Sequence, residues 1–327
     1  MNRLTRRTAL GAGLGLVACA PVVQHSGPPP PGFAGPRLEP DVFVAADGTR
    51  LPMDVWAAEG EPWAVIVALH GMNDYAHAFA SAAPWWAAQG VTTYAYDQRG
   101  FGRAPDRGLW GGTRLLTDDL RAIAALVRAR HPKAVVGVLG HSMGGAVAIS
   151  AFASSSPPQA DRLILAAPAV WGWSRQALPN RLALWLAAHV APGWRVVAPS
   201  WLTRRIRASD NIEVLRAMGR DRHMIFDTRV DAIYGLVQLM QAADEGLPRV
   251  RAPVLYLYGA RDQIIPRSAA LHAARGLKPT DRSAFYPEGW HLLTRDLQGP
   301  KVWADVLAFL RDPAAPLPSG TGPLPKA

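Results

Sequence analysis

The chain has 327 residues, of which 49% are apolar, and carries a formal net charge of +10. A chain of this length can bury a large core, and its composition favours one domain of about 250 residues with an insertion over two equal domains. Arginines are spread along the chain rather than gathered in a basic block with aromatic residues. This argues against nucleic-acid binding and leaves an anionic lipid surface as a candidate partner.

The first 19 residues have the form of an export signal, with a basic head, an apolar stretch over residues 9–18 and small residues at the end. Arg6 and Arg7 resemble a twin-arginine signal. The apolar stretch is too short to cross a hydrocarbon core of about 30 Å as a helix. The letters LVAC resemble a bacterial lipobox, in which Cys19, the only cysteine, would carry a lipid. The alternative is a signal that is cut nearby, with loss of Cys19. We expect an exported bacterial lipoprotein that faces the periplasm or the cell exterior.

Two segments near the ends of the chain contain few residues able to build a core. Residues 20–41 are rich in Pro and Gly, and we expect them to form a flexible tether. Residues 313–327 have a similar composition and are expected to be disordered.

Strand and helix patterns alternate from residue 42 onward. Asp47-Gly48 is a strong turn signal between strand-like runs at 43–46 and 51–57, and it predicts an antiparallel hairpin. The alternation predicts an α/β fold with a mostly parallel central sheet, helices on both faces and the hairpin at one edge. The expected strands are 64–69, 92–96, 135–139, 163–167, 254–258 and 283–286, and the expected helices are 76–89, 115–130, one after Ser142, 268–275 and 301–310.

Residues 168–252 interrupt this alternation, so the core is expected over 42–167 and 253–312. The interruption is helix-like, rich in tryptophan, and follows a strand, which places it over the crevice where α/β sheets bind ligands. We expect a helical cap, with most of its tryptophans in a small core. Within it, Leu182, Trp185 and Leu186 belong to a run that is apolar nearly all round. They are candidates for lining an acyl channel or touching lipid, and a buried cap helix is an equal alternative.

The sequence GHSMGG at residues 140–145 fits the pattern G-x-S-x-G between a strand-like and a helix-like run. In that context a tight turn presents the serine above the helix N-terminus, so Ser142 is the candidate nucleophile. A serine N-cap would also begin a helix. That alternative leaves the three neighbouring glycines unexplained.

A serine nucleophile needs a base, and the base needs an acid that orients it. In this fold the expected chain order is serine, acid, histidine. Asp262 follows a strand in YGARD, and His291 follows the next strand in GWH. Asp231 and Asp244 lie in the insertion and His272 lies on an expected helix, so they fit this order less well.

A tetrahedral intermediate needs hydrogen-bond donors aimed at its oxyanion. The expected donors are the backbone N–H groups of Met143 and Met72, the latter in the loop HGMN after the strand 64–69. His70 is then expected to be structural and not a general base.

The motifs HGMND, YDQRGFG, GHSMGG, YGARD and GWH occur in this order and together resemble the α/β-hydrolase superfamily, in its monoacylglycerol lipase and lysophospholipase branch. The likeness spans roughly residues 42–310. It implies Ser142 as nucleophile, Asp262 as acid, His291 as base, and Met72 and Met143 as oxyanion donors. Trp290 departs from the small residue usual before the histidine.

The expected function is hydrolysis of acyl esters such as monoacylglycerols or lysophospholipids. A serine aminopeptidase or amidase is the first alternative, because Asp210, Glu213 and Asp227 of the insertion could hold a substrate amine. A binding protein that has kept the fold without catalysis is the second. The sequence implies no metal or organic cofactor. The expected partners are a small acyl ester or lipid and a bacterial membrane, and the oligomeric state is left open.

Overall fold

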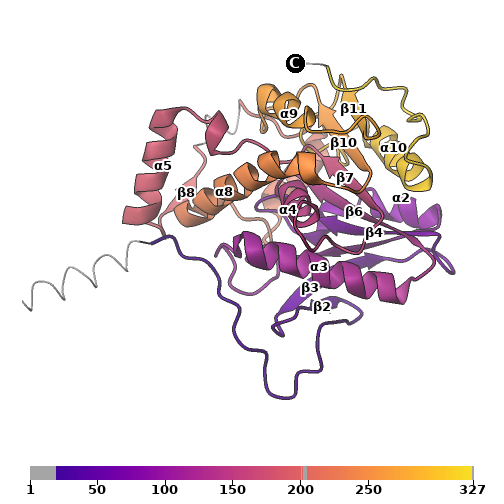
Figure 1. The fold of residues 1–327 in the computed structure, drawn as a ribbon. Helices are drawn as coiled ribbons and strands as arrows, with labels where there is room; N and C mark the ends of the chain where they lie inside the picture. Colours follow the sequence, from indigo (N-terminus) through magenta and orange to yellow (C-terminus); the bar gives the residue numbers. More distant parts are fainter. Residues whose placement is uncertain (1–19, 200, 202–204, 326–327) are drawn as a thin grey trace, which may run out of the picture.

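The computed structural model describes residues 20–199, 201 and 205–325, and it confirms the expected fold class (Figure 1). Nine strands form one open sheet in the order β1-β2-β3-β5-β4-β6-β7-β10-β11. The strands from β5 to β11 are parallel, whereas β1, β2 and β3 pair antiparallel at one edge. Their bounds are β1 Arg37–Leu38, β2 Val42–Val44, β3 Arg50–Trp56, β4 Ala64–Leu69, β5 Val91–Tyr96, β6 Val135–His141, β7 Arg162–Ala166, β10 Val254–Gly259 and β11 Arg282–Tyr286.

Helices cover both faces of the sheet. One face packs against α3, α4, α8 and α9, and the other against η1, α2 and α10. Every residue of β4, β5 and β10 is buried, which explains why β4 and β10 appear in the sequence as nearly continuous apolar runs. The helix bounds are η1 Ala76–Phe79, α2 Ala83–Ala88, α3 Gly112–Arg130, α4 Met143–Phe152, α8 Val230–Gly246, α9 Arg267–Ala274 and α10 Gly299–Arg311.

The one helix expected over residues 76–89 is two separate pieces, η1 and α2. Pro84 lies in the first turn of α2. Proline has no N–H for the hydrogen bonds of a helix interior but is accepted at a helix start, so it favours a new beginning at this point.

A buried arginine fixes the expected hairpin to the body. Arg99 donates to both carboxylate oxygens of Asp47, in the β2–β3 turn, at 2.9 and 3.0 Å, and to both oxygens of Asp119, on α3, at 2.6 and 2.9 Å. All three side chains are at most 8% exposed. Burial opposes the charge of Asp47, but hydrogen bonds from Arg99 and Thr49 lower the pKa of Asp47 to about 2. The stabilisation that Asp47 contributes is therefore present above about pH 4 and is lost as the pH falls toward 2.

Replacing Arg99 with methionine is expected to lower the free energy of unfolding by about 3–5 kcal/mol, because two buried carboxylates lose their partner. The matched control is Arg50→Met, which breaks an exposed ion pair with Glu39 and should leave stability close to that of the wild type, because solvent screens such pairs. Urea unfolding at pH 7 measures both. Equal stability of the two variants would contradict this role of Arg99.

The inserted segment 168–252 combines helices with a short antiparallel ribbon that the sequence did not indicate. It comprises η2 Trp173–Arg175, α5 Leu178–Val190, β8 Arg195–Val197, α7 Ile212–Arg220, β9 Asp227–Arg229, α8 and η3 Leu247–Arg249. Its last helix, α8, packs on α4 and belongs to the layer that covers the sheet. The expected tryptophan core is wrong for three of the five tryptophans, because Trp185, Trp194 and Trp201 are at least half exposed.

Both segments expected to be loose pack on the body where the structure describes them. Gln24 bonds the backbone of Trp110 and Leu109, and β1 extends the sheet. Near the C-terminus, Gly322 accepts a hydrogen bond from the N–H of Phe285, and Leu324 is buried. Backbone hydrogen bonds and a few apolar side chains hold these segments, which a Pro- and Gly-rich composition does not reveal.

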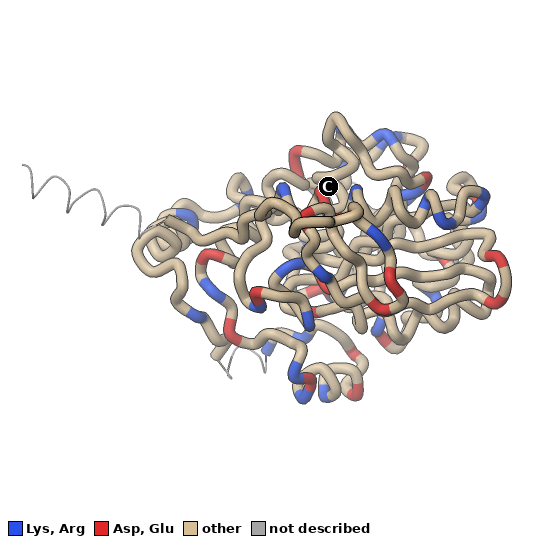
Figure 2. Tube along the Cα trace, turned by 90° about the horizontal axis from the view of Figure 1, so that it is seen from below, with Lys and Arg blue, Asp and Glu red and all other residues tan. Residues whose placement is uncertain are grey.

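Figure 2 shows Lys and Arg interspersed with Asp and Glu over most of the tube. Among the described residues, no helix is both long enough and apolar enough to cross a bilayer.

Candidate active site

Ser142 stands at the sharp junction between β6 and α4. Its backbone has φ 51° and ψ −116°, a conformation that is costly for a residue with a side chain and that the surroundings must hold in place. They do so through backbone bonds, since the N–H of Ser142 donates to Ala166 and its carbonyl accepts from Ala169 and Ala146. Ser142 Oγ forms no hydrogen bond within the described part of the chain, and the residue is 8% exposed.

The glycines around Ser142 are required by close packing. A Cβ on Gly140 would lie 2.5 Å from the carbonyl oxygen of Gly144, and one on Gly144 would lie 2.3 Å from that of Leu69. These distances leave no space for a side chain, so the turn after β6 can be made only by this kind of sequence. The N-cap alternative does not account for this crowding.

Asp262 and His291 meet although 29 positions separate them in the chain. The distance from His291 Nδ1 to Asp262 Oδ2 is 2.8 Å, and both side chains are buried. The other carboxylate oxygen of Asp262 accepts the N–H groups of Ile264 and Ile265 at 2.7 and 3.0 Å. These bonds fix the carboxylate, which holds the proton of His291 on Nδ1 and leaves Nε2 free to accept a proton.

His141, the neighbour of Ser142 in the chain, contacts His291. The two rings are 4.9 Å apart between centroids, and His141 Nε2 lies 3.1 Å from the carbonyl oxygen of His291. Burial, and then the nearby His291, lower the pKa of His141 well below its ordinary value, so the ring is neutral. Because a carbonyl can only accept, Nε2 of His141 must carry the hydrogen. His141 directly precedes Ser142, so this bond links the two loops of the site.

The loop after β4 lies against Ser142. A Cβ on Gly71 would lie 3.3 Å from Cβ of Ser142, which brings the adjacent Met72 to the nucleophile. Met143 is the first residue of α4, so its N–H has no acceptor within the helix. Both residues expected as oxyanion donors therefore lie near Ser142 in the chain path.

His70 has the structural place expected for it. Its Nε2 accepts the N–H of Gln98 at 2.9 Å, and Nδ1 lies 2.8 Å from the carbonyl oxygen of Gly71. Complete burial lowers the pKa of His70, which keeps the ring neutral and suits one donating and one accepting nitrogen. His70 thus fixes the backbone of the loop that carries Met72.

Three further residues, which the sequence did not predict, hold these loops. Asp74 forms a buried ion pair with Arg295, which joins the loop after β4 to the loop of His291. Asp296 accepts the N–H of Trp290 at 2.7 Å and the hydroxyl of Ser209 at 2.6 Å. Burial raises the pKa of Asp296 to about 6. Asp74 stands within HGMND, but Arg295 and Asp296 carry no local signal of these contacts.

The remaining candidates do not join the site. Leu182, Trp185 and Leu186 are each at least half exposed on α5, and the described contacts do not connect them with Ser142. Cys19 lies outside the described residues.

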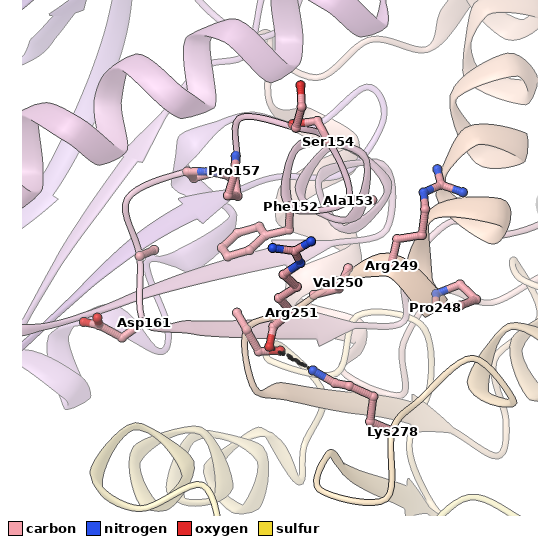
Figure 3. Close-up of a pocket in the computed structure, with 14 residues that line it drawn as sticks. Phe152, Ala153, Ser154, Pro157, Asp161, Pro248, Arg249, Val250, Arg251 and Lys278 are labelled. Carbon is pink, nitrogen blue, oxygen red and sulfur yellow. Dashed lines mark hydrogen bonds between the residues drawn. The ribbon is translucent and has the colours of Figure 1, made fainter.

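Two cavities differ in their position relative to the candidate site. One of about 960 Å³ lies at the far end of α4 from Ser142, between residues 152–161 and 248–252, and Figure 3 shows Lys278 bonded there to the carbonyl oxygen of Arg251. The other, of about 270 Å³, adjoins the loop of Met72 and the loop of His291 through Asp74 and Arg295. Val214, Ala217 and Met218 of α7 form part of its wall. Of these two cavities, the smaller one therefore adjoins the loops of the candidate site, although Ser142 and His291 are not among the residues that line it.

Known proteins resemble this chain in sequence and in fold. The monoacylglycerol lipase of Mycolicibacterium smegmatis is 25% identical over 289 residues, which cover 82% of this chain and 95% of that protein. The monoglyceride lipase of Rattus norvegicus is 26% identical over 271 residues, which cover 81% and 86%. Among solved structures, the Paleococcus ferrophilus monoacylglycerol lipase has a TM-score of 0.66 at 19% identity, with coverage of 80% and 98%. A thermostable carboxyl esterase from Bacillus coagulans has a TM-score of 0.70 at 18% identity, with coverage of 84% and 98%.

The structural likenesses establish the fold. Residues 60–298, more than half of the chain, match the family described as Serine aminopeptidase, S33. The chain is an α/β-hydrolase and belongs to this family.

Proposed function

We propose that this protein is a carboxylic ester hydrolase that cleaves monoacylglycerol-like or lysophospholipid-like acyl esters through an acyl-enzyme on Ser142. The observation that carries the proposal is the bond of 2.8 Å between Asp262 and His291, beside a serine in a strained turn. The lipase names of the sequence relatives support the substrate class.

The reaction follows from the arrangement of the three side chains. Ser142 Oγ attacks the ester carbonyl carbon while His291 Nε2 takes its proton, and Asp262 stabilises the imidazolium that forms. The N–H groups of Met72 and Met143 stabilise the oxyanion. Collapse breaks the bond to the alcohol, which leaves with the proton of His291. Water then attacks the acyl-enzyme, with His291 as base, and releases the fatty acid.

The cavity beside α7 adjoins the two loops through Asp74 and Arg295 and offers a place for the acyl chain, in addition to the expected wall on α5. Each CH₂ removed from water contributes about 0.8 kcal/mol. We therefore expect kcat/KM to rise with acyl length until the available space is filled.

The chain belongs to a family described as serine aminopeptidases, which keeps an aminopeptidase as the second candidate function. Such an enzyme needs an acid free to hold the substrate amine. Asp210 accepts the N–H of Leu297, Glu213 pairs with Arg216, and Asp227 pairs with Arg195. All three candidate acids are thus already engaged, which favours the ester.

The deciding experiment compares kcat/KM of the full chain for acyl esters of graded length with that for aminoacyl anilides. We expect ester cleavage to dominate and to depend on chain length. Dominant cleavage of aminoacyl anilides would identify the aminopeptidase, and no turnover together with no fluorophosphonate labelling would identify a binding protein.

We also propose that the protein is an exported bacterial lipoprotein with its lipid on Cys19. Cys19→Ser is expected to move most of the protein from the membrane to the soluble fraction. The variant lacks the lipid, and one weak membrane-binding signal without it gives only marginal binding. Ser26→Ala, an exposed change in the same segment, is the control. Cell fractionation with immunoblotting measures both, and unchanged fractionation of Cys19→Ser would refute the lipid anchor.

A further inference from the structure

The insertion presents a large apolar surface to solvent, which we term the cap face. Monomeric proteins seldom expose contiguous apolar area of this kind without a partner. Its members are between 50% and 65% exposed and comprise Leu178, Leu182, Trp185, Leu186, Val190 and Trp194.

The apolar stripe of α5 faces outward. Leu178, Leu182, Leu186 and Val190 recur every four residues, which places them on one side of the helix. Only Ala188 of this helix is buried. A helix of a globular protein usually turns such a stripe to the core, so the stripe on α5 is available to a partner.

The segment that carries the cap face has charged residues of one sign only. Residues 171–209 contain six arginines and no Asp or Glu. Arg195 pairs with Asp227 of β9, whereas Arg181, on α5 itself, is exposed. Apolar side chains with tryptophan and arginine among them suit the interface of a bilayer that contains anionic lipid.

The start of the described chain is fixed beside this surface by residues 22–24, which we term the N-terminal clamp. Val23 packs against the core, and Gln24 bonds the carbonyl oxygens of Trp110 and Leu109, both at 2.8 Å. The N–H of Val22 lies 3.4 Å from a carboxylate oxygen of Asp231 in the first turn of α8.

Asp231 also belongs to the edge of the cap face. Its N–H donates to the carbonyl oxygen of Pro192, and the N–H of Val230 donates to that of Trp194. Both acceptors lie in the turn that follows α5. Figure 1 shows that the described part of the chain begins beside α5 and the start of α8. Cys19 is three positions before Val22 in the sequence, and three residues of extended chain span about 10 Å at most.

We propose that the N-terminal clamp orients the enzyme on the membrane, by holding the lipid on Cys19 at the edge of the cap face so that both enter the same anionic bilayer. The inference rests on the lipid anchor and the ester hydrolysis proposed above. The lipid on Cys19 holds the protein at the bilayer, and the cap face adds an apolar contact that sets its orientation there. The clamp thereby turns the insertion, and the candidate active site that the insertion adjoins, toward the lipid.

The orientation can be measured on the full lipidated chain in vesicles of phosphatidylglycerol and phosphatidylcholine. The lipid occupies the sulfur of Cys19, so Leu186→Cys introduces the one free thiol for an environment-sensitive fluorophore. We expect a blue shift of its emission on reconstitution, and none for Lys301→Cys on α10, which is far from α5 in Figure 1. Equal emission at the two positions would overturn the proposal. So would a blue shift that needs no vesicles and grows with protein concentration, because a second copy would then cover the cap face.

The clamp itself is tested by Val23→Ser with Gln24→Ala, both made in the labelled Leu186→Cys protein. The membrane fraction should stay unchanged because the lipid is intact, while at least half of the blue shift should be lost. His25→Ala, just outside the clamp and exposed, should keep it. If the double variant unfolds at a markedly lower temperature, the single variant Gln24→Ala is measured in its place. A full blue shift in the clamp variants would refute the role of the clamp.

Failure of the two proposals can be told apart. Unchanged fractionation of Cys19→Ser removes the anchor. Lipidated protein with no blue shift at position 186 contradicts the orientation alone, and an acyl-length effect of Leu186→Ser on soluble esters at unchanged vesicle binding would assign this residue to the substrate channel instead.

Discussion

Replacing Ser142 with alanine is expected to lower kcat for ester hydrolysis by a factor on the order of 10⁶, because only this hydroxyl can form the acyl-enzyme. The fold should be retained, since the backbone bonds that hold the turn involve the N–H and carbonyl of residue 142 and not its side chain. Steady-state kinetics on a short soluble ester, with circular dichroism of the same preparation, measures both effects.

A matched serine provides the control. Ser150 lies on the same helix, α4, and its buried Oγ has no hydrogen-bond partner in the described structure. Ser150→Ala should keep the wild-type rate. Fluorophosphonate labelling that persists in Ser142→Ala would locate the nucleophile elsewhere and refute the proposed mechanism.

Changing Asp262 to asparagine is expected to lower kcat by about 10⁴ with little loss of stability. The asparagine oxygen can still accept the N–H groups of Ile264 and Ile265, so the loop should stay in place. Its amide nitrogen, however, would face His291 as a donor. The ring would then carry its proton on Nε2 and could not take the proton of the serine.

The control for Asp262 is Asp281→Asn, a mostly buried aspartate that bonds backbone N–H groups of residues 254 and 278, away from the site. Its effect on kcat should stay within about twofold. The pH profile of kcat/KM should also differ in Asp262→Asn, because the group that orients the base has lost its charge. A rate near that of the wild type would show that another acid orients His291.

The parts of the site that the sequence predicts are those with local physical causes. A strained turn with no space for side chains requires glycines at fixed offsets, so residues 140–145 carry their own signature. The strand-to-helix alternation likewise predicts the sheet, because buried parallel strands must be continuously apolar. Chain order then selects Asp262 and His291 from many acids and nine histidines.

Contacts between distant segments had no such signature. Asp74 and Arg295 are 221 positions apart, and Val22 and Asp231 are 209 apart. Each pair depends on the path of the whole chain, and an aspartate or arginine looks the same in the sequence whether its partner is water or a buried ion. The same holds for the N-terminal and C-terminal segments, whose composition suggested no packing.

The sequence by itself thus determined the fold class, the tight turn at Ser142 and the chain order of Ser142, Asp262 and His291, because steric and hydrophobic requirements act on neighbouring residues. The tertiary structure alone decided which face of α5 meets solvent, where the first described residues are held, and which side chains brace the loops of Met72 and His291. A helix that is apolar on most sides can pack in either direction, and only the shape of the surface beneath it determines which side is buried.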